Sequence, residues 1–95
     1  MFIINITYKV DLDKVDRFLN AHVKFLDKQY ELGNFIASGR KVPRTGGIIL
    51  CTASNKQVVE KIIEIDPFKQ NKLANYDLIE FVPSKASSEL SFLLG

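Results

Sequence analysis

The order in which strand-like and helix-like patterns follow one another limits the fold of this chain more than any other feature. Residues 2–10 alternate, with Phe2 and Ile4 at the start of one face, which is the period of a β-strand. Residues 11–33 then carry apolar side chains at helical spacing and stop at a glycine, Gly33. We therefore expect a first strand followed by a helix of about five turns.

A hairpin is expected next. Residues 34–42 are strand-like but weakened by Gly39, and the segment "PRTGG" at 43–47 contains residues that favour a chain reversal. Residues 48–53 form a nearly continuous apolar run, which is typical of a central strand that is covered on both faces.

A second helix and a last strand complete the pattern. Ser54 and Gln57 match a capping box, and apolar residues recur at helical spacing as far as Ile63. Pro67 should end this helix, because the residue before a proline disfavours helical backbone angles. Residues 76–82 then predict a strand. The order βαββαβ predicts an α+β fold, the ferredoxin-like sandwich of an antiparallel sheet with two helices on one face.

The length of 95 residues allows one domain. We expect residues 1–83 to form it and residues 84–95 to be a C-terminal tail. The tail ends in four apolar residues, Leu90, Phe92, Leu93 and Leu94. This apolar end either docks on a partner subunit or remains disordered, and the sequence does not decide between the two.

The sheet is expected to have an apolar face that the two helices do not cover. Ile36, the run from Ile48 to Cys51, Ile79 and Phe81 offer apolar side chains on both sides of their strands. Packing two such faces against each other would remove them from water. The sequence therefore predicts a homodimer that packs sheet against sheet.

Composition argues against several classes of function. The net charge is +2, and the charged residues, 25% of the chain, form no block of like sign, so a nucleic-acid surface is not expected. The single cysteine, Cys51, lies in an apolar run and should be a small buried side chain. One histidine and one distant cysteine are too few ligands for a zinc or iron site, so no metal is expected. The N-terminal run is too short for a signal or membrane segment, so we expect a cytoplasmic protein with no membrane partner.

The only histidine, His22, is the first candidate for chemistry. Its neighbours on the same helical face are Phe18, Leu19, Phe25 and Leu26, so its ring should face the core. A buried polar group costs about 1–3 kcal/mol when it has no hydrogen bond. Two interpretations remain open: a structural histidine that binds a backbone carbonyl or a water, or a histidine that is paired with a carboxylate.

Asp66 is the candidate for that carboxylate. It follows the apolar stripe of the second helix, where the helix dipole disfavours a negative charge by roughly 0.3–1 kcal/mol. Asp66 should therefore have a partner elsewhere. A carboxylate that holds one ring nitrogen of His22 would fix the tautomer and prepare the other nitrogen for proton transfer.

Three segments resemble a known family when they are taken together. "AHVKFLDKQYELGNFIASG", "GGIILCTAS" and "IDPF" are similar to the YciI-like (YCII-related) proteins of the dimeric α/β-barrel superfamily, over residues 2–82. The resemblance implies a ferredoxin-like fold, a homodimer and an active site with a His-Asp pair, carried here by His22 and Asp66. One branch of that family eliminates HCl from a chlorinated hydroxylated aromatic, whereas most members have no assigned reaction.

Two functions follow as hypotheses. In the first, the protein is a lyase or isomerase in which His22 and Asp66 perform general acid/base chemistry on a small carbonyl or phenolic substrate. In the second, the same pocket binds a small metabolite without turnover. The expected substrate-binding residues are Ser38, Arg40, Phe68, Phe18 and Phe25, with Arg44 and Thr45 exposed in the turn. For Ser38 and Arg40 a second interpretation remains open, a solvated face of an edge strand. Nothing in the sequence requires a cofactor.

Overall fold

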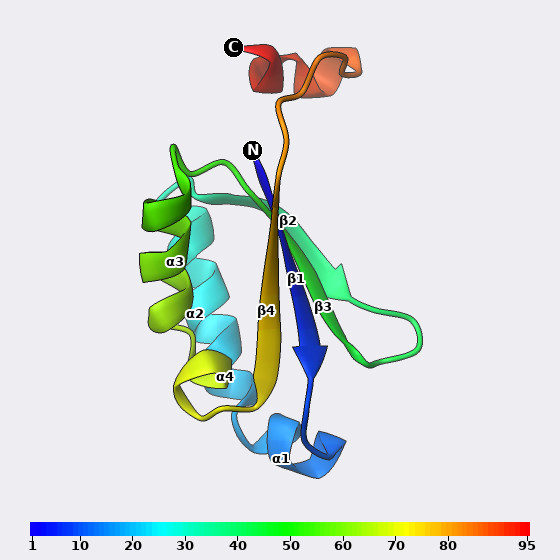
Figure 1. Ribbon diagram of the computed structural model, residues 1–95, viewed down its shortest axis with the longest axis vertical. Coiled ribbons are helices and arrows are strands. Elements are labelled where there is room, and N and C mark those ends of the chain that lie inside the picture. Colours follow the sequence, from blue (N-terminus) through cyan, green and yellow to red (C-terminus); the bar gives the residue numbers. More distant parts are fainter.

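The computed structural model describes residues 1–95 as one four-stranded sheet with helices on one of its sides (Figure 1). The strands are β1 (Phe2–Tyr8), β2 (Phe35–Arg40), β3 (Gly46–Cys51) and β4 (Ala74–Glu80). The α-helices are α1 (Leu12–Arg17), α2 (Leu19–Glu31), α3 (Lys56–Glu64) and α4 (Pro67–Gln70), and a 3-10 helix, η1, spans Ser88–Leu94.

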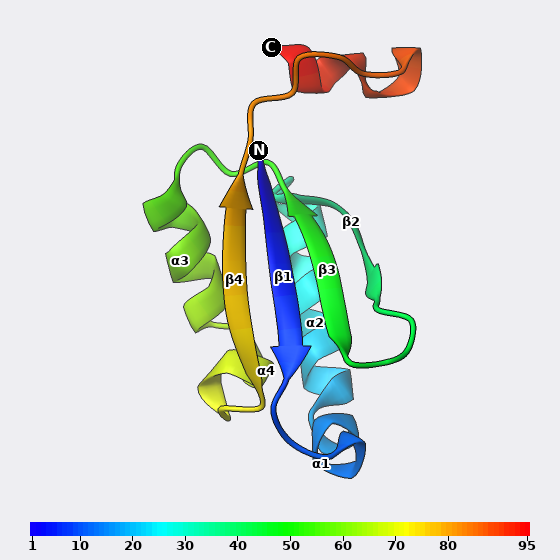
Figure 2. The same ribbon diagram turned by 45° about the vertical axis from the view of Figure 1, so that its right-hand side comes forward.

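The strands lie in the order β2-β3-β1-β4, and every neighbouring pair is antiparallel (Figure 2). This order and the helices on one side confirm the predicted ferredoxin-like α+β fold. None of the helices combines the length with the apolar character that crossing a bilayer requires.

Alternation along β1 decides which residues the helices cover. Phe2, Ile4 and Ile6 are at most 2% exposed and point toward the helices. They belong to a core cluster that the helices complete, with Phe25, Phe35, Ile49, Cys51, Val59, Ile62, Ile63 and Ala74. The prediction that Cys51 is buried is confirmed, and burial raises the pKa of its thiol. A second, smaller cluster of Val15, Phe68 and Leu73 lies near α1 and α4.

The first predicted helix is in fact two helices, because α1 ends at Arg17 and α2 begins at Leu19. Phe18 between them has φ −108° and ψ 5°, outside the helical range. The two helices pack in different clusters. Val15 and Phe18 pack in the smaller cluster, whereas the buried residues of α2 face the sheet, so one straight helix would not present both sets inward.

Two boundaries around the hairpin and the second helix differ from the sequence prediction. β3 begins at Gly46, inside the predicted turn. The strand can lie this close to β1 because residue 46 has no side chain: a Cβ there would lie 1.8 Å from the carbonyl oxygen of Ile6. The predicted cap at Ser54 is wrong. Asn55 caps α3, since its side-chain oxygen accepts from the backbone N–H of Val58, the bond that a capping Ser54 would have supplied one residue earlier.

The last strand begins earlier than expected, at Ala74 rather than residue 76, and ends at Glu80. After it the chain leaves the body of the molecule, and η1 stands beyond the end of the sheet (Figure 1). Leu90, Phe92 and Leu94 of η1 are between 44% and 62% exposed. The docking of the tail on a partner stays a prediction.

Candidate functional site

Asp66 lies between two helices and caps the second one. α3 ends at Glu64, and Asp66 is the N-cap of α4, where its Oδ1 accepts from the backbone N–H of Phe68 at 3.0 Å. Pro67 explains this geometry, because proline suits the first helical position and keeps the preceding residue extended. The carboxylate that seemed to lie at the unfavourable end of one helix therefore lies at the favourable end of the next.

His22 is the partner that Asp66 required. The Nδ1 atom of His22 lies 2.7 Å from Oδ1 of Asp66, across 44 residues of sequence. His22 is 8% exposed and Asp66 is fully buried. Because a carboxylate accepts, Nδ1 carries the proton that is donated, and Nε2 is the nitrogen that remains available for another partner. Nε2 has no hydrogen bond within the chain.

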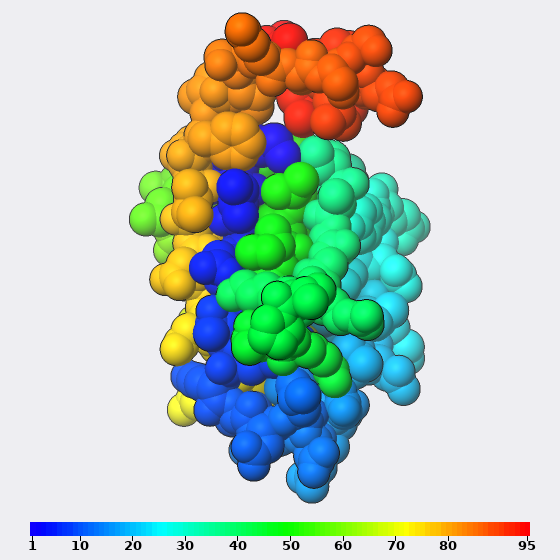
Figure 3. Space-filling view, turned by 90° about the vertical axis from the view of Figure 1, so that its right-hand side faces the viewer, coloured from blue at the N-terminus to red at the C-terminus, as the bar shows by residue number.

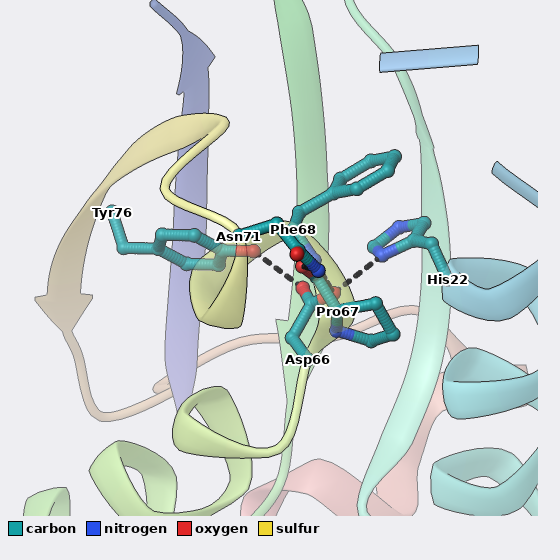
Figure 4. Close-up of polar contacts among 6 residues, drawn as sticks. All are labelled: His22, Asp66, Pro67, Phe68, Asn71 and Tyr76. Carbon is teal, nitrogen blue, oxygen red and sulfur yellow. Dashed lines mark hydrogen bonds and ion pairs between the residues drawn. The ribbon is translucent and has the colours of Figure 1, made fainter. Parts of the chain in front are cut away.

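The aromatic ring of Phe68 fixes the plane of the histidine. The two ring centroids are 3.9 Å apart and the rings are 4° from parallel. Phe68 follows Asp66 by two residues, so the same turn of chain supplies both the carboxylate and the stacking surface (Figure 4). His22 is thus held by one hydrogen bond at Nδ1 and by one apolar face.

Tyr76 of β4 completes a network that the sequence did not indicate. Its hydroxyl donates to Oδ2 of Asp66 at 2.5 Å, from the side of the carboxylate opposite His22 (Figure 4). Burial and the negative charge of Asp66 raise the pKa of this phenol well above its ordinary value of 10.0, so it remains a donor. Asp66 accordingly accepts three hydrogen bonds, from His22, Phe68 and Tyr76.

A signal for Tyr76 was present in the strand period. Tyr76 is paired with Ile6, and Leu78 is paired with Ile4, so both project on the helix side of the sheet. An inward-facing tyrosine needs a partner for its hydroxyl, just as an inward-facing histidine does. The sequence does not say which polar group supplies that partner.

A cavity of about 520 Å³ opens beside His22, between α2 and the hairpin end of the sheet. Its apolar lining residues are Ile6, Leu19, Val23, Leu26, Ile48, Ile49 and Phe68. Its polar lining residues include Tyr8, Asp16, His22, Ser38, Arg40 and Arg44. This volume lies within the usual range of small-molecule pockets, about 300–1,000 Å³.

The predicted substrate-binding residues divide into two groups. Ser38, Arg40 and Phe68 line the cavity with His22. The Ser38 hydroxyl also shares a hydrogen bond of 2.7 Å with the hydroxyl of Tyr30 on α2. Phe18 and Phe25 do not line the cavity, because Phe25 is buried in the main core and Phe18 packs in the smaller cluster.

Arg44 departs from its expected place. It is half-buried and pairs with Asp16 of α1 at 2.5 Å, whereas the sequence indicated an exposed turn residue. Both residues line the cavity. The pair connects the loop between β2 and β3 to α1, and the pKa of Arg44 is raised by its hydrogen bond to Asp16. No three His, Cys, Asp or Glu side chains lie together as a metal site would require.

A protein of known structure has the same fold. A solved structure, 5-chloro-2-hydroxyhydroquinone dehydrochlorinase (TftG) from Burkholderia phenoliruptrix AC1100 in complex with 2,5-dihydroxybenzoquinone, shares the fold with a TM-score of 0.75. The two chains are 18% identical over 84% of this chain and 91% of the other. No curated protein matches the sequence.

A family model describes most of the chain. The model of the YCII-related domain matches residues 1–82, which include all four strands, helices α1 to α4 and the residues around the cavity. The protein belongs to the YCII-related domain family.

Proposed function

We propose that this protein is a small enzyme in which His22 transfers a proton to or from a carbonyl or phenolic compound bound in the cavity. The observation that carries the proposal is the 2.7 Å contact between Nδ1 of His22 and the buried Asp66, beside a cavity of about 520 Å³ that His22 lines. The dehydrochlorinase that shares the fold supports chemistry on a small hydroxylated ring.

The proposed chemistry is general acid/base catalysis of a lyase or isomerase reaction. As a base, Nε2 takes a proton from the carbon next to a carbonyl or from a phenol, and the ring becomes an imidazolium. The negative charge of Asp66 stabilises that imidazolium and keeps Nδ1–H in place. In an elimination the leaving group departs with its bonding electrons; in an isomerisation Nε2–H returns the proton to another carbon.

The residues around His22 and Asp66 have supporting roles in this proposal. Tyr76 and the backbone N–H of Phe68 hold the Asp66 carboxylate in one orientation. Phe68 shields the imidazole from water on one face. The rigid environment keeps Nε2 directed at one point of the cavity, which favours proton transfer over a flexible side chain.

The test is proton exchange in D₂O. Small hydroxylated aromatics, chlorinated ones among them, and enolisable carbonyl compounds are incubated with the protein. The loss of C–H signals is followed by NMR, and the release of chloride from the chlorinated compounds by ion chromatography. We expect His22→Gln to abolish the reaction and Asp66→Asn to reduce it by about 10²-fold or more. Asp27→Asn is the matched control, because Asp27 lies exposed on α2 and does not line the cavity.

The proposal is wrong if a compound reacts equally well with His22→Gln. It is also wrong if ligands bind in the cavity and none of them reacts, with His22→Gln only weakening their binding. In that case the protein is a metabolite-binding module, which was the second hypothesis from the sequence.

A homodimer is part of the proposal. Figure 3 shows the face of the sheet opposite the helices. On this face Ile3 is paired with Leu50 on one side and Ile79 on the other, so three apolar side chains form a row. Ile79 is 52% exposed in the single chain. Near this row, Oδ1 of Asn5 is buried without a hydrogen-bond partner, which a second copy would supply.

Sedimentation velocity tests this pairing. We expect the native protein to sediment as a dimer and Ile79→Lys to sediment as a monomer, because a charge would be buried in the interface. Ile65→Lys is the matched control, since Ile65 is similarly exposed, at 55%, but lies at the end of α3 on the other side of the sheet. A monomeric native protein, or equal effects of the two changes, would contradict the proposed dimer.

A further inference from the structure

One charged side chain on the cavity wall has no partner within the chain. Four lining residues can carry a charge near neutral pH: Asp16, His22, Arg40 and Arg44. Asp16 and Arg44 form an ion pair with each other, and His22 donates to Asp66, which lies behind the cavity wall. The remaining group is the guanidinium of Arg40, an exposed residue that also lines the cavity and has no carboxylate within ion-pair distance and no side-chain hydrogen bond in the chain.

The sheet register explains why Arg40 faces an open space. Arg40 is paired with Gly47 on β3, and Gly47 is paired with Ile6 on β1, so the three residues form one row across the sheet on the helix side. Gly47 has no side chain to cover the guanidinium. The missing side chain leaves a hollow in the row, with Arg40 at one side of it and the apolar surface of Ile6 at the other.

Ser38 lies on the same face of β2, two residues before Arg40. Its hydroxyl lies 2.7 Å from that of Tyr30, so α2 holds it in place as a further polar group on the arginine side of the cavity. The opposite wall is apolar and contributes Leu19, Val23 and Leu26 of α2. The cavity thus offers an apolar surface, one unpaired cation and the free Nε2 of His22.

From this arrangement we infer that the cavity selects a small monoanion, a single apolar ring or chain with one carboxylate, phenolate or enolate group that binds Arg40. A guanidinium binds such oxygen atoms through two parallel N–H donors, and the bond is stronger because both partners are charged. The inference rests on the proposed function, because it names the class of substrate that the same cavity takes.

Arg40 and His22 have different roles in this cavity. Arg40 fixes the anionic group at the β2 side of the cavity, and the reacting atom then lies toward His22 and Phe68. Arg44 does not take part in anion binding, because Asp16 already neutralises it. A neutral compound of the same shape loses the ion pair with Arg40 and binds more weakly.

The experiment compares two isosteric probes, benzoate and benzamide. Binding is measured by titration, with the ring signals of His22, the only histidine, as the NMR reporter together with the amide signals of Gly39, Gly46 and Gly47. We expect benzoate to bind at least roughly tenfold more tightly than benzamide. Arg40→Gln should remove this preference and leave the binding of benzamide unchanged.

Lys41→Gln is the matched control. It removes the same charge from the adjacent residue, but the ammonium of Lys41 binds Oγ1 of Thr7, whose side chain projects on the face without helices. The preference for benzoate should therefore survive in this variant. Added salt should weaken benzoate more than benzamide, because only the anion forms an ion pair.

Three outcomes overturn the inference: equal affinity for the two probes, an equal effect of Arg40→Gln and Lys41→Gln, or no change in the signals around the cavity with either probe. The proposed proton transfer is judged separately. A reaction that needs His22 but proceeds equally well with Arg40→Gln refutes the anion preference alone. Selective benzoate binding without any reaction that depends on His22 refutes the proposed function alone.

Discussion

Removal of the Tyr76 hydroxyl tests whether the buried carboxylate depends on its third donor. In Tyr76→Phe the ring keeps its shape, but Oδ2 of Asp66 loses the hydrogen bond of 2.5 Å that Tyr76 provides. No other group in the chain donates to this oxygen, since His22 and the backbone of Phe68 both bind Oδ1. Asp66 is fully buried, so water cannot readily take the place of the hydroxyl.

The expected loss of stability in Tyr76→Phe follows from the cost of leaving a buried charged acceptor without a hydrogen-bond donor. Hydrogen bonds to charged groups contribute about 1.5–3 kcal/mol, so we expect Tyr76→Phe to lower the free energy of unfolding by about 2 kcal/mol. With a urea dependence of about 1–3 kcal/mol per molar for a small domain, the midpoint of unfolding should fall by roughly 1 M.

Urea unfolding followed by circular dichroism measures this change, and Tyr30→Phe is the control. That substitution also removes a tyrosine hydroxyl with a bond of 2.7 Å, but the bond is exposed and water can replace it, so the loss should be below about 1 kcal/mol. If Tyr76→Phe changes the free energy of unfolding by less than about 0.5 kcal/mol, or by no more than Tyr30→Phe, the reasoning about the carboxylate is wrong.

The remaining predictions concern stability and pH. Asn55→Ala should cost about 1 kcal/mol in urea unfolding through loss of the α3 cap, whereas Ser54→Ala should be nearly neutral; the reverse order would restore the cap at Ser54. Gly46→Ala should give no folded protein by circular dichroism, because its Cβ would overlap the Ile6 carbonyl. Because the folded-state pKa of Tyr76 is raised, the unfolded chain loses that proton first, and stability should fall as pH rises above about 10. Tyr76→Phe lacks this contribution, so its deficit relative to the native protein should shrink above pH 10, and a constant deficit would contradict the raised pKa.

The local patterns of the sequence were sufficient to predict the helices and strands and their order along the chain. Alternation in residues 2–10 and helical spacing after residue 11 depend only on which neighbours share a face, and this follows from the period of each element. The same rule placed His22 on a buried face. The break at Phe18 was not visible, because it depends on the smaller cluster, which forms only when α1 and α4 meet.

Asp66 and Tyr76 show where local patterns cease to be enough. The sequence established that a buried histidine and a carboxylate beyond the end of a helix each need a partner, because an unpaired buried polar group is costly. That they meet depends on the packing of α4 against α2, which joins positions 44 residues apart. Tyr76 enters the same network from β4, and no spacing in the sequence specifies that approach.

The sequence by itself thus determined the order βαββαβ, the buried position of His22 and the requirement for a partner at Asp66, since each follows from local period or from the cost of an unpaired polar group. Only the tertiary structure decided that Asp66 accepts from His22 and Tyr76 together, that Asp16 neutralises Arg44, and that Arg40 is left unpaired beside a cavity. These are contacts between elements, and they arise from how the helices and the hairpin pack on the sheet.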